Sequence, residues 1–226
     1  MIGQPTIDLA NLPAPKHGLV GFWSSVVEGV RPTGTFRNLA MGVYDGALQS
    51  DAYVKPGSGL VLDGTSYRSL HSYTPLVMSF GTRDHTFQCW FKTSTLANQT
   101  LMCKISSLSL NGTWLYLRNS NPYIRFLTTS TWTGSMNIRV DDNVWHFVTG
   151  SRIGTTLYVF LDGRQVDSQA GSTDDCTNSE TFVLGARQTK ELFTGNIDMP
   201  MVYNGHGITL AEHQAFYHAT RGLFGV

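Results

Sequence analysis

The sequence predicts an all-β sandwich, and one strand–loop–strand block is the best reason for it. The apolar segments 143–148 and 156–161 flank a loop that contains Gly154, and the second segment runs into Asp162-Gly163. That dipeptide is typical of a tight hairpin, because it tolerates the positive φ that the turn requires. Many further short β-type segments, separated by Gly, Asn and Pro, indicate the same fold class.

Ten segments are predicted as strands and one as a helix. The strands are 19–23, 59–62, 86–92, 99–105, 113–118, 123–127, 145–151, 156–161, 181–184 and 195–203. Near the C-terminus, Thr209 and Glu212 have the spacing of a capping box, in which each side chain satisfies a backbone N–H of the first helical turn. We therefore expect a short helix that begins at Leu210.

Length and composition limit what the chain can be. Its 226 residues fit one large all-β domain of about 200–250 residues. Hydrophobic residues make up 41%, which supports a core, whereas charged residues make up only 14%, against about 25% in ordinary domains. Because the formal net charge is zero, we expect no nucleic-acid or membrane partner.

The N-terminal segment predicts an arm rather than part of the domain. Residues 1–16 contain Pro5, Pro13 and Pro15 and have little apolar pattern, so they form either a disordered tail or an arm that docks on a neighbouring subunit. Residues 17–226 form the domain. We find no secretion signal and no apolar run of about 18 residues, so we expect synthesis in the cytoplasm without export by a signal peptide.

Eight motifs in order resemble a known family. They are 18–23 (GLVGFW), 59–67 (GLVLDGTSY), 85–92 (HTFQCWFK), 145–146 (WH), 161–163 (LDG), 193–198 (FTGNID), 202–204 (VYN) and 210–212 (LAE). Together they resemble a laminin-G-like domain of the concanavalin-A-like jelly-roll superfamily over residues 18–217. The resemblance implies a two-sheet antiparallel jelly-roll sandwich with one short C-terminal helix. Members bind glycans or proteins, cleave polysaccharides or serve as structural modules, so the fold alone names no function.

Catalysis is not expected. Glycosidases of this superfamily carry acidic residues two apart on a strand, because the reaction needs two carboxyls about 5–9 Å apart. None of the four glutamates has an acidic partner at that spacing, and the side chains of the adjacent pairs Asp141-Asp142 and Asp174-Asp175 diverge. The glutamates are Glu28, Glu180, Glu191 and Glu212. We predict no catalytic residue and no enzyme activity.

No metal ligand is assigned either. The cysteines Cys89, Cys103 and Cys176 are odd in number and form no CxxC pair, so their spacing does not indicate zinc. Cys89 and Cys103 lie in predicted strands, where a free thiol is typically a small buried side chain. Calcium is the cofactor that the resemblance allows, through an Asp side chain and loop carbonyls. The candidates are Asp162, Asp198 and the Asp174-Asp175 loop, and each also has a structural interpretation. We therefore predict no cofactor.

The hairpin 113–127 is the best candidate for a binding face. Because side chains alternate along a strand, Leu115 and Leu117 share one side and the aromatic and basic residues share the other. The candidate ligand-binding residues are Trp114, Tyr116, Arg118, Tyr123, Arg125 and Trp132. Trp, Tyr and Arg dominate interface hot spots. The alternative is that a loop covers this side and that Trp114 and Tyr116 fill a second small core.

These observations predict a non-enzymatic structural or recognition module. The missing signal, the low charge, the Ser/Thr/Gly-rich surface and the arm favour a virion surface protein of a bacteriophage, either a capsid decoration or a tail-associated protein. Its partners would be other copies of itself or other virion proteins. One alternative is a carbohydrate-binding lectin-like domain that uses the aromatic face. Another is a polysaccharide-cleaving glycanase, which needs a carboxylate pair that we do not find.

Overall fold

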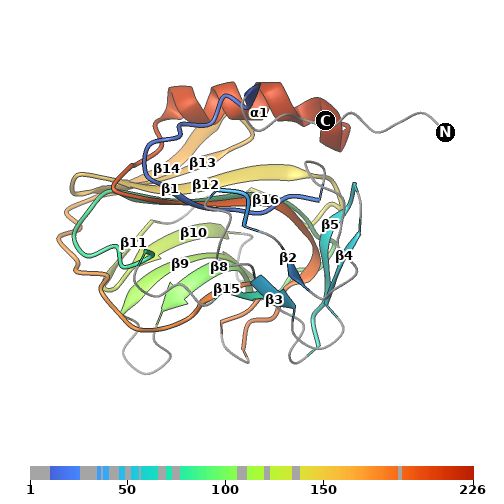
Figure 1. Cartoon of the computed structure of the whole chain (residues 1–226), viewed down its shortest axis with the longest axis horizontal. Helices are drawn as coiled ribbons and strands as arrows, with labels where there is room; N and C mark the ends of the chain where they lie inside the picture. The colour runs from blue at the N-terminus through green and yellow to red at the C-terminus, as the bar shows by residue number, and fades with distance from the viewer. Residues whose placement is uncertain are drawn as a thin grey trace.

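The computed structural model describes residues 11–25, 35–36, 38–40, 46–48, 52–55, 57–65, 70–72, 77–105, 111–119, 123–133, 138–187 and 190–226. Two antiparallel sheets face each other in this part of the chain, and one helix lies outside them (Figure 1). The predicted all-β sandwich with a C-terminal helix is confirmed.

Sheet A, next to the helix, contains eight described strands. In spatial order they are β14 (Arg164–Ala170), β13 (Thr156–Leu161), β12 (His146–Ile153), β7 (His85–Lys92), β16 (Thr194–Asn204), β5 (Gly59–Asp63) and β4 (Tyr53–Lys55), with β1 (Leu19–Phe22) paired to β16. Asp162 and Gly163 join β13 to β14 with φ values of 49° and 81°. The predicted tight turn is therefore confirmed as a two-residue loop with both φ angles positive.

Sheet B also contains eight described strands. In order they are β11 (Thr131–Trp132), β10 (Tyr123–Thr128), β9 (Gly112–Arg118), β8 (Gln99–Ile105), β15 (Phe182–Leu184), β6 (Leu70–Ser72), β3 (Gly46–Leu48) and β2 (Thr35–Phe36). All ten predicted strands occur, with bounds that differ by at most two residues. The prediction missed the short strands β2, β3, β4, β6 and β11 and the polar strand β14.

The main core lies between the two sheets. Phe87, Cys89 and Phe91 of β7 point into it from sheet A, and Leu115 and Leu117 of β9 point into it from sheet B. Successive side chains point to opposite faces of a strand, and both strands are buried on both faces, since Trp90 of β7 packs in the layer beneath α1. Cys89 and Cys103 are buried free thiols, which matches their predicted role as small apolar side chains, and Cys176 is a buried free thiol as well.

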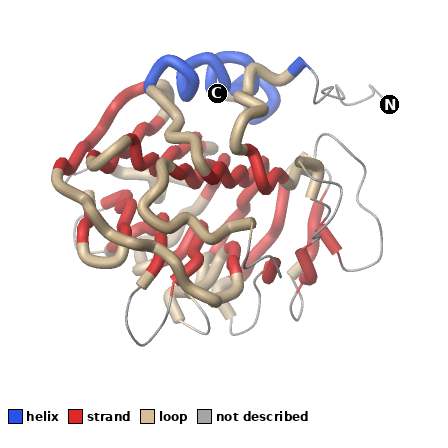
Figure 2. The backbone as a smooth tube through the Cα atoms, turned by 60° about the vertical axis from the view of Figure 1, so that its left-hand side comes forward, coloured by secondary structure: helices blue, strands red, loops and turns tan. Residues whose placement is uncertain are grey.

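Helix α1 (Leu210–Phe224) covers the outer face of sheet A (Figures 1 and 2). The predicted capping box is present, since Glu212 N–H donates to Thr209 Oγ1 and Thr209 N–H donates to the Glu212 carboxylate. Trp90 donates its indole N–H to Thr220 Oγ1 at 3.1 Å and stacks on Phe224. The helix thus buries a second apolar layer on this sheet. No helix among the described residues has the length and hydropathy needed to span a bilayer.

The described part of the predicted arm lies against the same layer. Leu12 and Ala14 are buried in the apolar cluster between α1 and sheet A, whereas residues 1–10 lie outside the described residues. The boundary at residue 16 stays a prediction. Leu12 and Ala14 nevertheless have packing partners within their own chain.

Candidate functional site

The predicted face forms on the outer side of sheet B. β9 pairs with β10 so that Tyr116 lies opposite Arg125 and Arg118 lies opposite Tyr123. β10 pairs with β11 so that Leu127 lies opposite Trp132. Because directly opposite residues share a face, the predicted aromatic and basic residues belong to one surface. The side chain of Tyr123 lies outside the described residues.

A loop covers the inner half of this face. Trp114 and Tyr116 are only 6% and 8% exposed, and their rings stack with centroids 3.8 Å apart. The guanidinium of Arg187 lies 4.6 Å from the centre of the Trp114 ring and is held by a bidentate ion pair with Glu191. The covered alternative therefore describes Trp114 and Tyr116, and these two rings present little surface to a ligand.

The outer half of the face remains open at the sheet edge. Trp132 on the edge strand β11 is 47% exposed, and the guanidinium of Arg125 stacks on its ring at 4.1 Å. Arg118 is partly exposed and belongs to the same face by strand alternation. An exposed indole braced by a cation can stack on a flat or apolar partner, while the arginines supply hydrogen-bond donors. We call Trp132, Arg125 and Arg118 the edge surface.

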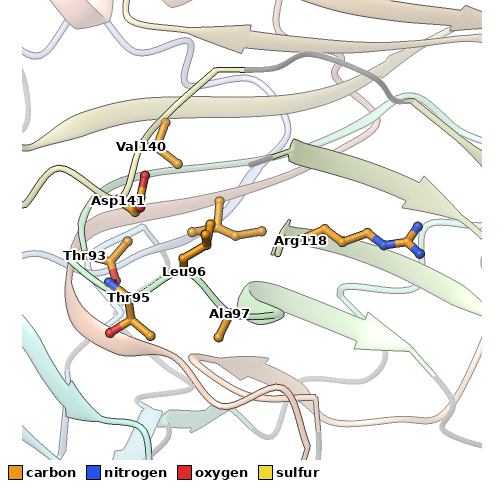
Figure 3. Close-up of a pocket in the computed structure, with 8 residues that line it drawn as sticks. Thr93, Thr95, Leu96, Ala97, Arg118, Val140 and Asp141 are labelled. Carbon is orange, nitrogen blue, oxygen red and sulfur yellow. The ribbon is translucent and has the colours of Figure 1, made fainter. Parts of the chain in front are cut away.

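A small pocket lies at the end of the sandwich where β7 and β9 end. Its lining residues are Thr93, Thr95, Leu96, Ala97, Leu117, Arg118, Val140 and Asp141, and its open volume is about 10 Å³. That is the space of about one water molecule. Figure 3 shows the side chain of Arg118 extending away from this pocket, along the sheet. The pocket is too small for a sugar ring, so it does not compete with the edge surface as a ligand site.

A carboxylate pair suited to glycoside hydrolysis has to lie across a space that admits the glycosidic oxygen. Asp142 and Asp162 approach each other from two loops, but the imidazole of His146 lies between them, with Nδ1 2.7 Å from Asp162 and Nε2 3.2 Å from Asp142. Burial opposes a charge on His146, yet hydrogen bonds to Asp162 and Asp142 outweigh it and raise its pKa. The ring fills the space in which a glycosidic oxygen would have to sit. This arrangement is suited to holding loops together.

The candidate calcium carboxylates are engaged within the protein. Asp162 also accepts from the backbone N–H of Phe147, and Asp198 accepts from Ser25 and from the N–H of Met199. Asp174 accepts from Thr128, Ser130 and Thr131, and these bonds outweigh burial and lower its pKa to about 2. Asp175 accepts from the N–H of Thr177. Among the described residues, no three His, Cys, Asp or Glu side chains gather as a metal site would require.

Sequence reasoning missed two contacts at the Asp162-Gly163 turn. Neither His146 nor His213 is among the candidate site residues that the sequence predicts. His213 lies on the buried face of α1. Gly163 N–H donates to Nε2 of His213 at 3.0 Å, a contact that no local pattern indicates.

Comparisons with known proteins agree with this fold. A family model described as the concanavalin A-like lectin/glucanases superfamily matches residues 62–208. No curated protein matches the chain.

Several solved structures share the architecture at low identity. One is the binding domain of Paraclostridial Mosquitocidal Protein 1, at 13% identity and a TM-score of 0.67, with 90% of this chain and 52% of that chain covered. Another is the binding domain of Botulinum Neurotoxin DC in complex with SialylT, at 12% identity and a TM-score of 0.66, with 90% and 52% covered. The same binding domain in complex with rat synaptotagmin II has 11% identity and a TM-score of 0.66, with 89% of this chain and 51% of that chain covered. The chain thus spans about half of each, and the likeness establishes the fold.

Proposed function

The chain belongs to the concanavalin A-like lectin/glucanases superfamily, and we propose that it is a non-enzymatic recognition module that contacts its partner through the edge surface. The observation that carries the proposal is the exposed Trp132 ring stacked on Arg125 at the open edge of sheet B. Trp and Arg are the residues that most often dominate binding energy. The guanidinium orients the indole, so less freedom is lost when a partner packs on it.

The setting that we propose is the surface of a bacteriophage virion, as a capsid decoration or a tail-associated protein. A domain with 14% charged residues and no net charge has weak self-repulsion, which suits close packing with copies of itself or with other virion proteins. The absence of a net positive charge disfavours nucleic acid as a partner. Leu12 and Ala14 pack against their own domain, so the proposed contact of the arm with a neighbouring subunit does not use these two side chains.

A carbohydrate partner is the second candidate, and the exposed Trp132 face is the observation that favours it. An indole ring offers the apolar face of a sugar a stacking surface, and nearby arginines can donate to its hydroxyls.

Two experiments test these proposals separately. Mass spectrometry of purified phage particles should detect the chain at a fixed copy number; finding it only in the free protein fraction would exclude the virion role. A glycan array probed with the purified protein should give selective binding if the second candidate holds. Binding to no glycan, together with incorporation into particles, would leave a protein partner. Absence from particles and from the array would exclude both settings.

A further inference from the structure

The Asp162-Gly163 turn is held from two sides by histidines with opposite requirements for protons. The turn joins β13 to β14 beside α1, on the opposite side of the sandwich from the edge surface. His146 of β12 holds the Asp162 carboxylate, and His213 of α1 holds the Gly163 backbone N–H. The side chain of Gln214 adds a bond to Gly163 O at 2.9 Å. The turn is therefore the point at which α1 is hydrogen-bonded to a hairpin of sheet A.

On the sheet side, the contact needs a protonated histidine. Nδ1 and Nε2 of His146 both face carboxylate oxygens, at 2.7 and 3.2 Å. A carboxylate can only accept, so the ring makes both bonds only as imidazolium, with a proton on each nitrogen. Asp162 is further held by Phe147 N–H at 2.8 Å. Acidification favours this side of the turn.

On the helix side, the contact needs a neutral histidine. Because Gly163 N–H donates to Nε2 of His213, that nitrogen must carry a lone pair, and the proton lies on Nδ1, which donates to Thr149 Oγ1 at 2.8 Å. Thr149 in turn donates to Gln88 Oε1. A second proton on His213 would point at the Gly163 N–H and break the bond.

The surroundings of His213 give that second proton no compensation. The ring is fully buried and lies between Phe147 and Phe160, with centroids 4.9 and 5.5 Å away. From β12, β13 and the turn, the described groups that face it are these two rings, Thr149 and Gly163 N–H, and none carries a charge. Asp162 is engaged by His146. Burial lowers the pKa of His213 to about 3.

The charged groups of α1 itself are engaged elsewhere on the helix. In the first turn, Glu212 bonds Thr209 and His206, and although burial opposes it, these contacts keep the Glu212 pKa below its usual range. In the last turn, Arg221 lies over the ring of Tyr217, and His218 is exposed. The helix N-terminus thus stays capped at mildly acidic pH.

We propose that the Asp162-Gly163 turn is an acid-sensitive latch, which releases helix α1 when His213 is protonated while His146 keeps the turn on sheet A. Release breaks no strand pairing, because α1 contributes no strand. It exposes the apolar layer beneath the helix, which includes Trp90, Phe147, Met201 and Tyr203. That layer would then be available to another apolar surface.

The size of the effect follows from proton linkage. A released helix restores His213 to a pKa of about 6.5, so each pH unit below that value favours release about tenfold until the docked form itself titrates. Between pH 8 and pH 5 the equilibrium constant for opening of α1 should rise about 30-fold.

Hydrogen exchange on the full chain, monitored by NMR at pH 8 and pH 5 and corrected for intrinsic rates, measures this constant. We expect α1 amides to show the 30-fold rise and to open more readily than the amides of β7 at pH 5. His213→Gln, whose amide oxygen can accept from Gly163 N–H, should remove the rise. His85→Gln, which changes another fully buried histidine in the main core, should leave it.

Three results would overturn the latch. One is an α1 opening constant that does not change with pH in the wild-type protein. A second is equal opening of α1 and β7 amides at pH 5, which would indicate global unfolding. A third is an undiminished rise in His213→Gln. The first two need no variant, so they hold even where a substitution impairs folding.

Discussion

Replacing Gly150 by alanine should destabilise the sandwich more than a single methyl group normally would. Gly150 lies on β12 of sheet A and faces Phe126 of β10 across the core. A Cβ built on Gly150 would lie 2.6 Å from Cγ and 2.9 Å from Cβ of Phe126. These atoms sit next to the backbone, so Phe126 cannot swing its ring aside and a sheet has to move.

Gly150→Ala should lower the free energy of unfolding by about 3 kcal/mol, the upper end of the range for overpacked cores. In a domain of this size that corresponds to a fall in Tm of roughly 6–12 °C. Denaturant unfolding followed by tryptophan fluorescence measures the free energy of unfolding directly. The control is Gly222→Ala, because a Cβ at this α1 position meets nothing within 4 Å. There the same substitution should stabilise the protein by up to about 1 kcal/mol through helix propensity.

A double mutant tests the cause. Phe126→Ala alone should lower the free energy of unfolding by about 3–5 kcal/mol, because it leaves a cavity. The double mutant should lose about 1–2 kcal/mol less than the sum of the two single mutants, since the new methyl group enters that cavity. Strict additivity, or a Gly150→Ala loss below about 0.5 kcal/mol, would refute the inter-sheet contact.

Three further predictions concern the cap and two titrating groups. Thr209→Ala should lower the free energy of unfolding by about 1 kcal/mol through loss of the N-cap, and Thr209→Ser, which keeps the hydroxyl, should restore most of it in the same denaturant assay. Burial, aided by the charge of Arg152 and opposed by the hydrogen bond to Arg83, lowers the His85 pKa to about 4. The unfolded state therefore binds more protons between pH 6.5 and 4, so the free energy of unfolding falls with acidification in that range. His85→Gln should reduce the slope of the free energy of unfolding against pH by about one proton, and an unchanged slope would contradict the burial of a neutral His85. The Asp174 pKa is also lower in the folded protein, at about 2, so its stabilisation is present above about pH 4 and is lost towards pH 2. Asp174→Asn should therefore reduce the dependence of the free energy of unfolding on pH between pH 4 and pH 2.

Local pattern predicted most of the sheet framework. The Asp162-Gly163 turn follows from backbone geometry, and β7 and β9 follow from their runs of apolar and aromatic residues, which are buried on both faces of the strand. β14 was missed because its sequence, Arg-Gln-Val-Asp-Ser-Gln-Ala, is largely exposed and has no apolar alternation. An edge strand of this kind is held by backbone pairing with β13, which leaves no mark on its composition.

The candidate face was predicted only in part, for a physical reason. Strand alternation correctly placed Trp114 and Tyr116 on one side of β9, but their cover comes from Arg187 and Glu191, about 70 residues further along the chain. Whether an aromatic pair faces solvent depends on such distant packing. The contact between His213 and Gly163 spans 50 residues and was missed for the same reason.

Binding of Trp132→Ala to purified phage particles and to the glycan array tests whether the edge surface is the contact surface. Tyr53→Ala is the matched control, because Tyr53 is a similarly exposed aromatic residue, 51% against 47%, at the edge of sheet A. We predict that Trp132→Ala loses at least about tenfold in affinity for the support that the wild-type protein binds, as expected for a hot spot, while Tyr53→Ala binds like wild type. Equal affinity of the wild-type protein and folded Trp132→Ala would contradict the claim.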